Sequence, residues 1–245
     1  MHFTKILSSI LLAATASASP LGSRNVTLGK RDDSDGQAGA YITAGTDVAF
    51  AFVYGSPKMP DLSNAAPSTS VWYWIGIDGV NTNRVIQAGF IATKKSDGTV
   101  TYEAFYEWYP IPATPIPASD FTASAGDVVS ITVAVTQTGT AATASFVNMN
   151  TDKSYNTPEF YSPDEDSDAT GINAEWAIER AADGTTLANF GEVIFTDCSA
   201  ADSGGYQYYL TGGTTLNMVV SGTTLATGTI VGDNEVWISD TQGLE

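Results

Sequence analysis

The chain has 245 residues, with 27 acidic residues against ten basic ones and a formal net charge of −17. This balance argues against a nucleic-acid or anionic-lipid surface, because both partners reward clustered Lys and Arg. The single histidine, His2, lies in the predicted signal peptide described below, so the mature chain would have none; this excludes catalysis by a Ser-His-Asp or Cys-His arrangement and a zinc site built on imidazole. The single cysteine, Cys198, excludes an intramolecular disulfide. Enzymatic chemistry would therefore fall to carboxylates, amides, hydroxyls or a lysine.

Residues 1–19 have the pattern of a secretory signal peptide, with Lys5 before a short apolar run at 6–14 and small residues before Pro20. The run is shorter than the roughly 18 apolar residues of a membrane-spanning helix. Residues 20–31 are interpreted as a short basic propeptide, because the Lys30-Arg31 pair resembles a kexin-like processing site; a flexible basic tail is the alternative. We expect a secreted, extracellular domain over residues 32–245, with six basic residues against 27 acids and a formal charge of −21.

Short alternating or apolar runs, separated by Gly, Asn, Asp and Pro, fill the rest of the chain. They predict strands at 71–78, 85–93, 99–109, 128–136, 141–148, 173–178, 192–196, 215–221 and 235–239. No segment after the signal peptide keeps the period of a long helix. The pattern predicts an all-β, single-domain antiparallel sandwich.

The stretch TYEAFYEWYP, residues 101–110, mixes aromatic and acidic side chains on both faces of a strand. Alternation places Trp108 on one face with Tyr102, and Glu107 on the other with Tyr109. Such faces are typical of a ligand groove on a sheet, or of an edge strand packed under a loop.

Two acidic motifs predict no site. A calcium loop needs carboxylates at set positions, a glycine turn and a closing glutamate. The acids and Gly171 of SPDEDSDATG, residues 162–171, do not have this arrangement, so we expect a solvated acidic loop. Asp202-Ser203-Gly204 is a tripeptide of aspartic peptidases, but their mechanism needs two such aspartates. We expect neither a metal nor a cofactor.

The stretch NAEWAIER, residues 173–180, alternates like a half-buried strand, with Trp176 on the apolar face and Glu175 and Glu179 on the other. A solvated face would explain both glutamates without any chemistry.

Six ordered blocks nevertheless resemble the glutamic peptidases, or eqolisins: WIGIDG (74–79), VIQAG (85–89), YEAFYEWYP (102–110), GDVVSITV (126–133), NAEWAIER (173–180) and GEVIFTDCS (191–199). The resemblance implies two curved antiparallel sheets of the concanavalin A-like jelly-roll type, with a groove on the concave face. It implies an acid endopeptidase acting on protein or peptide substrates, which we expect to be a monomer. It assigns Gln87 and Glu175 as catalytic residues. It also implies a set of residues that either bind the substrate or support the residues that do: Trp74, Asp78, Glu107 and Trp108.

Under this resemblance, Glu175 would be ionised, with a pKa near 4, and would take a proton from water and return it to the departing amine. Gln87 would orient that water and donate to the oxyanion. Glu179 is interpreted as a groove-edge or solvated residue. Two alternatives stay open: a jelly-roll glycoside hydrolase using Glu107 and Glu175, and a non-catalytic binding module on the same fold.

The chain departs from the family pattern in three places. GQAGAY, residues 36–41, places Gln37 where family members usually have a tryptophan that borders the substrate. Cysteines common in the family are missing, including one in the turn at 81–83, and the predicted propeptide is short. Subsite specificity and the route of activation are therefore left open by the sequence.

Overall fold

The computed structural model describes residues 30–80, 82–181 and 185–242. The predicted signal peptide and residues 20–29 of the predicted propeptide lie outside the described residues. The first described strand, β1 (Lys30–Ser34), includes the predicted processing site after Arg31.

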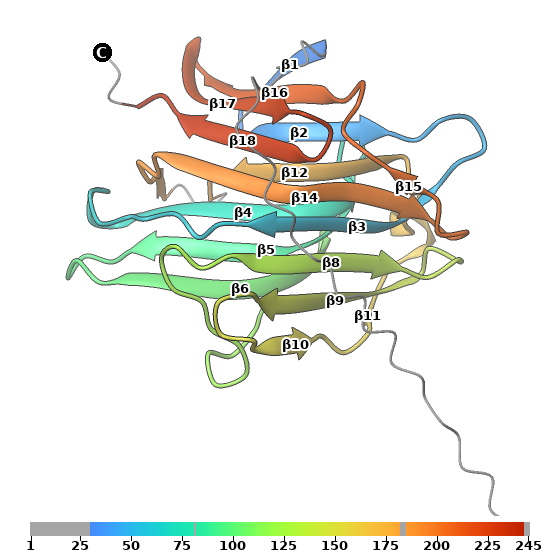
Figure 1. The fold of residues 1–245 in the computed structure, drawn as a ribbon, viewed down its shortest axis with the longest axis horizontal. Helices are drawn as coiled ribbons and strands as arrows, with labels where there is room; N and C mark the ends of the chain where they lie inside the picture. Colours follow the sequence, from blue (N-terminus) through green and yellow to red (C-terminus); the bar gives the residue numbers. More distant parts are fainter. Residues whose placement is uncertain (1–29, 81, 182–184, 243–245) are drawn as a thin grey trace, which may run out of the picture.

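Two layers of strands form the body of the molecule (Figure 1). Hydrogen bonding orders one layer as β1, β16 (Thr214–Val220), β2 (Gln37–Thr43), β12 (Asn173–Glu179), β4 (Thr69–Asp78), β5 (Val85–Lys94), β6 (Val100–Tyr109) and β7 (Thr114–Pro115). It orders the other as β17 (Thr223–Val231), β18 (Glu235–Asp240), β14 (Glu192–Asp202), β3 (Phe50–Pro57), β8 (Val129–Val135) and β9 (Ala141–Asn148).

Short elements complete the two layers. β10 (Ser154–Asn156) and β11 (Phe160–Tyr161) pair with β9, β13 (Thr186–Leu187) with β4, and β15 (Gln207–Tyr208) with β14. The hairpin of β16 and β17 joins the layers, because β16 also pairs with β2 and β17 also pairs with β18. The predicted all-β sandwich is confirmed.

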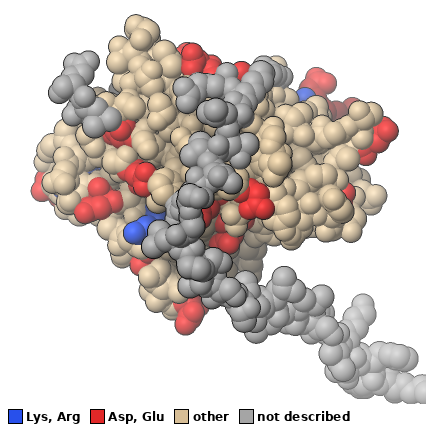
Figure 2. Space-filling view, turned by 45° about the horizontal axis from the view of Figure 1, so that its top comes forward, with Lys and Arg blue, Asp and Glu red and all other residues tan. Residues whose placement is uncertain are grey.

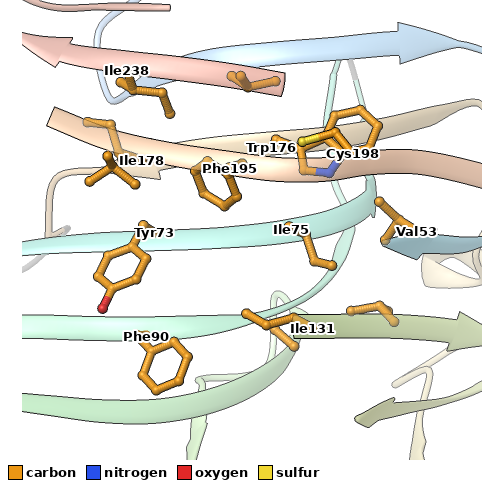
Figure 3. Close-up of a cluster of buried hydrophobic side chains, with 14 of the residues drawn as sticks. Val53, Tyr73, Ile75, Phe90, Ile131, Trp176, Ile178, Phe195, Cys198 and Ile238 are labelled. Atoms are coloured by element: carbon orange, nitrogen blue, oxygen red, sulfur yellow. The ribbon is translucent and has the colours of Figure 1, made fainter. Parts of the chain in front are cut away.

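The core lies between the layers and is built by the alternation of each strand. Tyr73, Ile75 and Trp176 point inward from one layer and meet Val53 and Phe195 from the other (Figure 3). Burial of each such side chain stabilises the fold by about 1.5–3 kcal/mol. The free thiol of Cys198 is buried in the same cluster, and burial raises the pKa of this thiol well above its ordinary value.

The described residues contain one helical element, the 3-10 turn η1 (Glu165–Ser167). No helix in these ranges is both long and apolar enough to cross a membrane.

Candidate active site

Polar side chains from neighbouring strands form one row across the face of the first layer that points away from the core. The register pairs Glu175 on β12 with Gly76 on β4, and Gly76 with Gln87 on β5. Gln87 in turn pairs with Glu107 on β6, while Glu175 pairs on its other side with Tyr41 on β2. Because directly paired residues point to the same face, these side chains share one surface.

Gly76 creates the space between Glu175 and Gln87. Neighbouring strands lie about 4.8 Å apart, so the backbones of these two residues are separated by roughly 10 Å. A Cβ atom on Gly76 would lie 3.0 Å from Cγ2 of Val85 and 3.1 Å from Cζ3 of Trp74, so these two side chains and the bare backbone form the floor of this gap. Two long side chains can therefore converge over that floor.

Glu175 is almost fully buried, with 1% of its surface exposed. Its carboxyl accepts a hydrogen bond from the backbone N–H of Val80, while Oε1 has no hydrogen-bond partner among the described residues. Gly79 packs against it: a Cβ atom there would lie 2.5 Å from Oε1, and φ is +112°, so only glycine fits. The turn after β4 is thus shaped around this carboxyl.

The amide of Gln87 is oriented by Glu107. Gln87 Nε2 donates a hydrogen bond to Glu107 Oε2, and Gln87 Oε1 has no partner among the described residues. Gln87 is 3% exposed. The two unpartnered oxygens, on Gln87 and Glu175, therefore lie on strands either side of Gly76.

Glu179 lies two side chains further along the same face of β12. Trp74 Nε1 donates to Glu179 Oε2 at 3.1 Å, and the side chain of Gln37 also forms a hydrogen bond with the carboxyl. Glu179 is therefore a residue at the edge of the site, held in place from β4 and β2. The hydrogen bonds with Trp74 and Gln37 explain why Glu179 is not a freely solvated glutamate.

Burial dominates the ionisation of these carboxyls. Desolvation, with smaller contributions from Asp78 and Glu179, raises the pKa of Glu175 to about 8, although the Val80 hydrogen bond lowers it. Desolvation likewise raises the pKa of Glu179 to about 7 and raises the pKa of Glu107. The expectation that Glu175 has a pKa near 4 was wrong, because the sequence does not reveal how completely the carboxyl is removed from water.

Asp78 and Trp108 do not join the row. The buried carboxylate of Asp78 accepts hydrogen bonds from Thr170 N, Thr170 Oγ1 and Ile172 N at 2.6–2.9 Å. Trp108 lies on the core face of β6, opposite Glu107, and its Nε1 donates to the backbone oxygen of Ser167 at 2.9 Å. Both side chains therefore hold the segment 167–172 against the ends of β4 and β6, and Trp108 is not placed in the groove.

A pocket of about 510 Å³ opens on the row and is lined by Gln37, Trp72, Gly79, Thr82, Arg84, Val85, Gln87, Glu107, Tyr109, Glu179, Arg180 and Ala181. A larger hollow, of about 860 Å³, lies at the opposite end of β6, around Tyr102, Ile116 and Phe121. That hollow contains neither Gln87 nor Glu175, whereas the smaller pocket is lined by Gln87 and by Gly79, which packs against the Glu175 carboxyl. Glu175 itself is not among the lining residues, and the smaller pocket is the candidate site. Within the described residues, no group of three or more His, Cys, Asp or Glu side chains is arranged to hold a metal ion.

The comparison with known families identifies the chain. The sequence profile of the Peptidase A4 family matches residues 35–240. The chain belongs to the peptidase A4 family. The predicted resemblance to glutamic peptidases is confirmed.

Individual members of the A4 family show how far the similarity extends. Aspergillopepsin-2 of Aspergillus niger is 32% identical over 164 residues, which cover 66% of this chain and 56% of that protein. The chain thus spans little more than half the length of this relative. Aspergilloglutamic peptidase from Aspergillus niger is similar in structure, with a TM-score of 0.62, 29% identity and coverage of 71% of this chain and 99% of that one.

Scytalido-glutamic peptidase, solved with a transition state analog inhibitor, shares the fold, with a TM-score of 0.70 and 24% identity. The alignment covers 84% of this chain and 98% of that one. The sandwich is therefore the fold of A4 peptidases.

Sequence patterns did not single out Trp72, Arg84 or Arg180, which line this A4 pocket, whereas alternation had placed Tyr109 on the face of Glu107. Trp72 shares a face with Trp74, so alternation along β4 could have found it. Arg84 directly precedes the block VIQAG, and Arg180 is the last residue of NAEWAIER. At such strand ends, alternation does not predict the direction of the side chain.

Proposed function

We propose that the protein is a secreted acid endopeptidase in which Glu175 transfers protons and Gln87 orients the attacking water. The observation that carries this proposal is the pair of buried, unpartnered oxygens, Glu175 Oε1 and Gln87 Oε1, on strands either side of Gly76. Buried polar atoms are normally hydrogen-bonded, so both oxygens require a partner such as water. Membership of the A4 family and the peptidase names of its relatives support the same reaction.

The raised pKa of Glu175, about 8, means that the free enzyme carries a neutral carboxylic acid in an acid medium. Its O–H donates the proton to the scissile carbonyl oxygen, while its other oxygen accepts a proton from the attacking water. The water oxygen bonds to the carbonyl carbon, the C=O π pair moves to the protonated oxygen, and the carboxyl ends this step still protonated.

Collapse of the resulting diol reverses the relay. One hydroxyl returns a proton to Glu175 as the C=O bond reforms, and Glu175 donates its own proton to the amide nitrogen as the C–N bond breaks. The carboxyl therefore accepts the proton of water, as the sequence predicts, but it starts from the protonated state.

Gln87 supplies hydrogen bonds on both sides of this step. Its Oε1 accepts a hydrogen bond from the attacking water, and the second N–H of its amide can donate to the oxygen of the tetrahedral intermediate. Loss of a donor of this kind raises a barrier by about 3–4 kcal/mol. The hydrogen bond to Glu107 fixes the amide before substrate arrives.

The direct test uses three single variants and an internally quenched peptide at pH 4. Glu175→Gln removes the proton-transferring group and Gln87→Ala removes the amide, so each variant should lose at least about 100-fold in rate. The double variant should lose less than the product of the two, because both residues act on one transition state. Glu103→Gln, an exposed glutamate on the same face of β6 outside the pocket, is the matched control and should keep its rate.

Near-normal turnover by a folded Glu175→Gln variant would refute the mechanism. Incubation with denatured casein and with xylan separates the functions: release of peptides supports the endopeptidase, release of sugars would indicate the glycoside hydrolase, and neither product would indicate a binding module.

A further inference from the structure

Arginine is concentrated at the pocket. Residues 32–242 contain six basic residues, and the two arginines among them, Arg84 and Arg180, both line the 510 Å³ pocket that contains Gln87. In so acidic a chain, this placement gives the pocket wall two permanent positive charges.

Arg84 is held by the turn that also supports Glu175. Thr82 Oγ1 accepts a hydrogen bond from Gly79 N at 2.9 Å and donates to the backbone oxygen of Arg84 at 2.7 Å. The guanidinium is fixed at its other end, because Nη1 donates to the backbone oxygen of Asp168. The Arg84 side chain, which lines the pocket, is therefore held at both ends.

The Arg84 guanidinium includes a donor that the described residues leave without an acceptor. Arg84 Nε is buried and makes no hydrogen bond within the described residues. The N–H groups at Nε and Nη form one side of the guanidinium fork, which matches the two oxygens of a carboxylate. A buried donor without an acceptor is unfavourable, and an anionic ligand would satisfy it.

The carboxyls that share the pocket compete weakly for Arg84 in an acid medium. Burial raises the pKa of Glu179 to about 7 and raises the pKa of Glu107, so both side chains are more protonated than ordinary glutamates at acidic pH. Glu107 is also hydrogen-bonded to Gln87, and Glu179 to Trp74. An ionised carboxylate on a substrate would then be the anion available to the fork.

We infer that Arg84 is a specificity-determining residue that binds a substrate carboxylate close to the scissile bond. Arg84 precedes Gln87 by three positions, which separates their backbones by roughly 10 Å along the strand direction. A substrate peptide in an extended conformation spans this distance with about three residues. The carboxylate belongs to an Asp or Glu side chain or to the C-terminus of the peptide. The inference rests on the proposed endopeptidase function and specifies its substrate class.

The test scans internally quenched peptides at pH 5, with Gln replaced by Glu at each of about three positions on either side of the scissile bond. At one position, wild-type enzyme should show a kcat/KM for Glu at least about tenfold above that for Gln, as expected for a hydrogen-bonded charged pair. Arg84→Gln should abolish this ratio. Arg84→Lys should restore only part of it, because lysine keeps the charge but lacks the fork.

Two further variants separate the fork from general electrostatics. Lys153→Gln makes the same change in charge at an exposed site outside the pocket and should keep the ratio. Arg180→Gln should also keep most of it, and an equal loss in Arg180→Gln and Arg84→Gln would overturn the assignment to Arg84. A comparison of kcat/KM for peptides that end in a free carboxylate and for the same peptides ending in an amide shows whether the enzyme binds the C-terminal carboxylate or a side-chain carboxylate.

The wild-type measurements alone can overturn the inference. Equal kcat/KM for Glu and Gln at every position, and for the free acid and the amide, would remove the carboxylate site even if no variant folds. That result differs from failure of the proposed function, in which none of the peptides would be cleaved.

Discussion

Glu175→Gln should stabilise the protein at neutral pH while it abolishes activity. The pKa of Glu175 is raised to about 8 in the folded state by burial, whereas a glutamate in an unfolded chain has a pKa of about 4.3. Below pH 4 both states hold the proton, so the group has little effect on stability. Between pH 4 and pH 8 the unfolded state releases the proton and the folded state keeps it, so stability falls as pH rises.

The expected magnitude follows from the two pKa values. At pH 7 the unfolded group lies 2.7 units above its pKa and the folded group remains mostly protonated, which corresponds to about 4 kcal/mol of lost stability at 1.36 kcal/mol per unit. Glutamine has nearly the same shape and no charge to desolvate. The variant should therefore gain about 4 kcal/mol over wild type at pH 7, or roughly 8–16 °C in Tm, and almost nothing at pH 4.

The measurement is urea unfolding at pH 4 and pH 7, followed by tryptophan fluorescence and circular dichroism. Gln87→Ala is the comparison variant, because it should also be inactive and free of self-digestion while it retains the Glu175 carboxyl. The decisive quantity is the change in stability from pH 4 to pH 7. If Glu175→Gln and Gln87→Ala lose stability equally over this range, the buried carboxyl is not the group that titrates, and the reasoning fails.

The remaining predictions concern pH, inhibitors and processing. With Glu175 protonated up to a pKa of about 8, kcat should stay level from pH 4 to pH 7 and fall as pH approaches 8; initial rates on a quenched peptide that climb steadily from pH 4 to pH 7 would instead require an ionised base. Activity should survive pepstatin and metal chelators, since the proposed mechanism uses neither an aspartate pair nor a metal; strong inhibition by pepstatin would reopen the aspartic assignment. N-terminal sequencing of the secreted enzyme should find Asp32, whose carboxylate accepts a hydrogen bond from Tyr41 at 2.8 Å beside Glu175, and an active species that starts near residue 20 would exclude the processing step.

The strands that the sequence predicts well are those with a clear apolar alternation. β4, β5, β6 and β12 carry large aromatic or branched residues on the core face, and all four lie where the pattern places them. β2, β3 and β17 were not among the predicted strands; the sequence of β17 is Thr- and Gly-rich and resembles a loop. β14 is longer than expected, because an irregular pairing between Thr196 and Ser199 interrupts its alternation while the strand continues to Asp202.

Local alternation was also a better guide to the site than the family resemblance at one position. The resemblance groups Trp108 with Glu107, whereas alternation along 101–110 sends adjacent side chains to opposite faces, and the structure follows alternation. The register that aligns Gly76 between Glu175 and Gln87 could not be predicted, because it depends on three strands far apart in the sequence. The burial that raises the pKa of Glu175 depends on that same assembly.

Acidity acts on this protein at two separate places. The surface carries dispersed carboxylates and few basic side chains, as Figure 2 shows for one face, and its self-repulsion declines only as pH falls toward 4. Glu175 and Glu179, with pKa values of about 8 and about 7, become neutral at much higher pH. A medium near pH 5 therefore neutralises both the buried Glu175 and the half-buried Glu179, while a carboxylate with an ordinary pKa near 4 stays mostly ionised. In that range Glu179 on the pocket wall is neutral, and the raised pKa of Glu107 also favours its neutral form, so the positive charges of Arg84 and Arg180 are opposed less than at neutral pH. The same protons that stabilise the site therefore provide the electrostatic setting that the proposed carboxylate substrate requires.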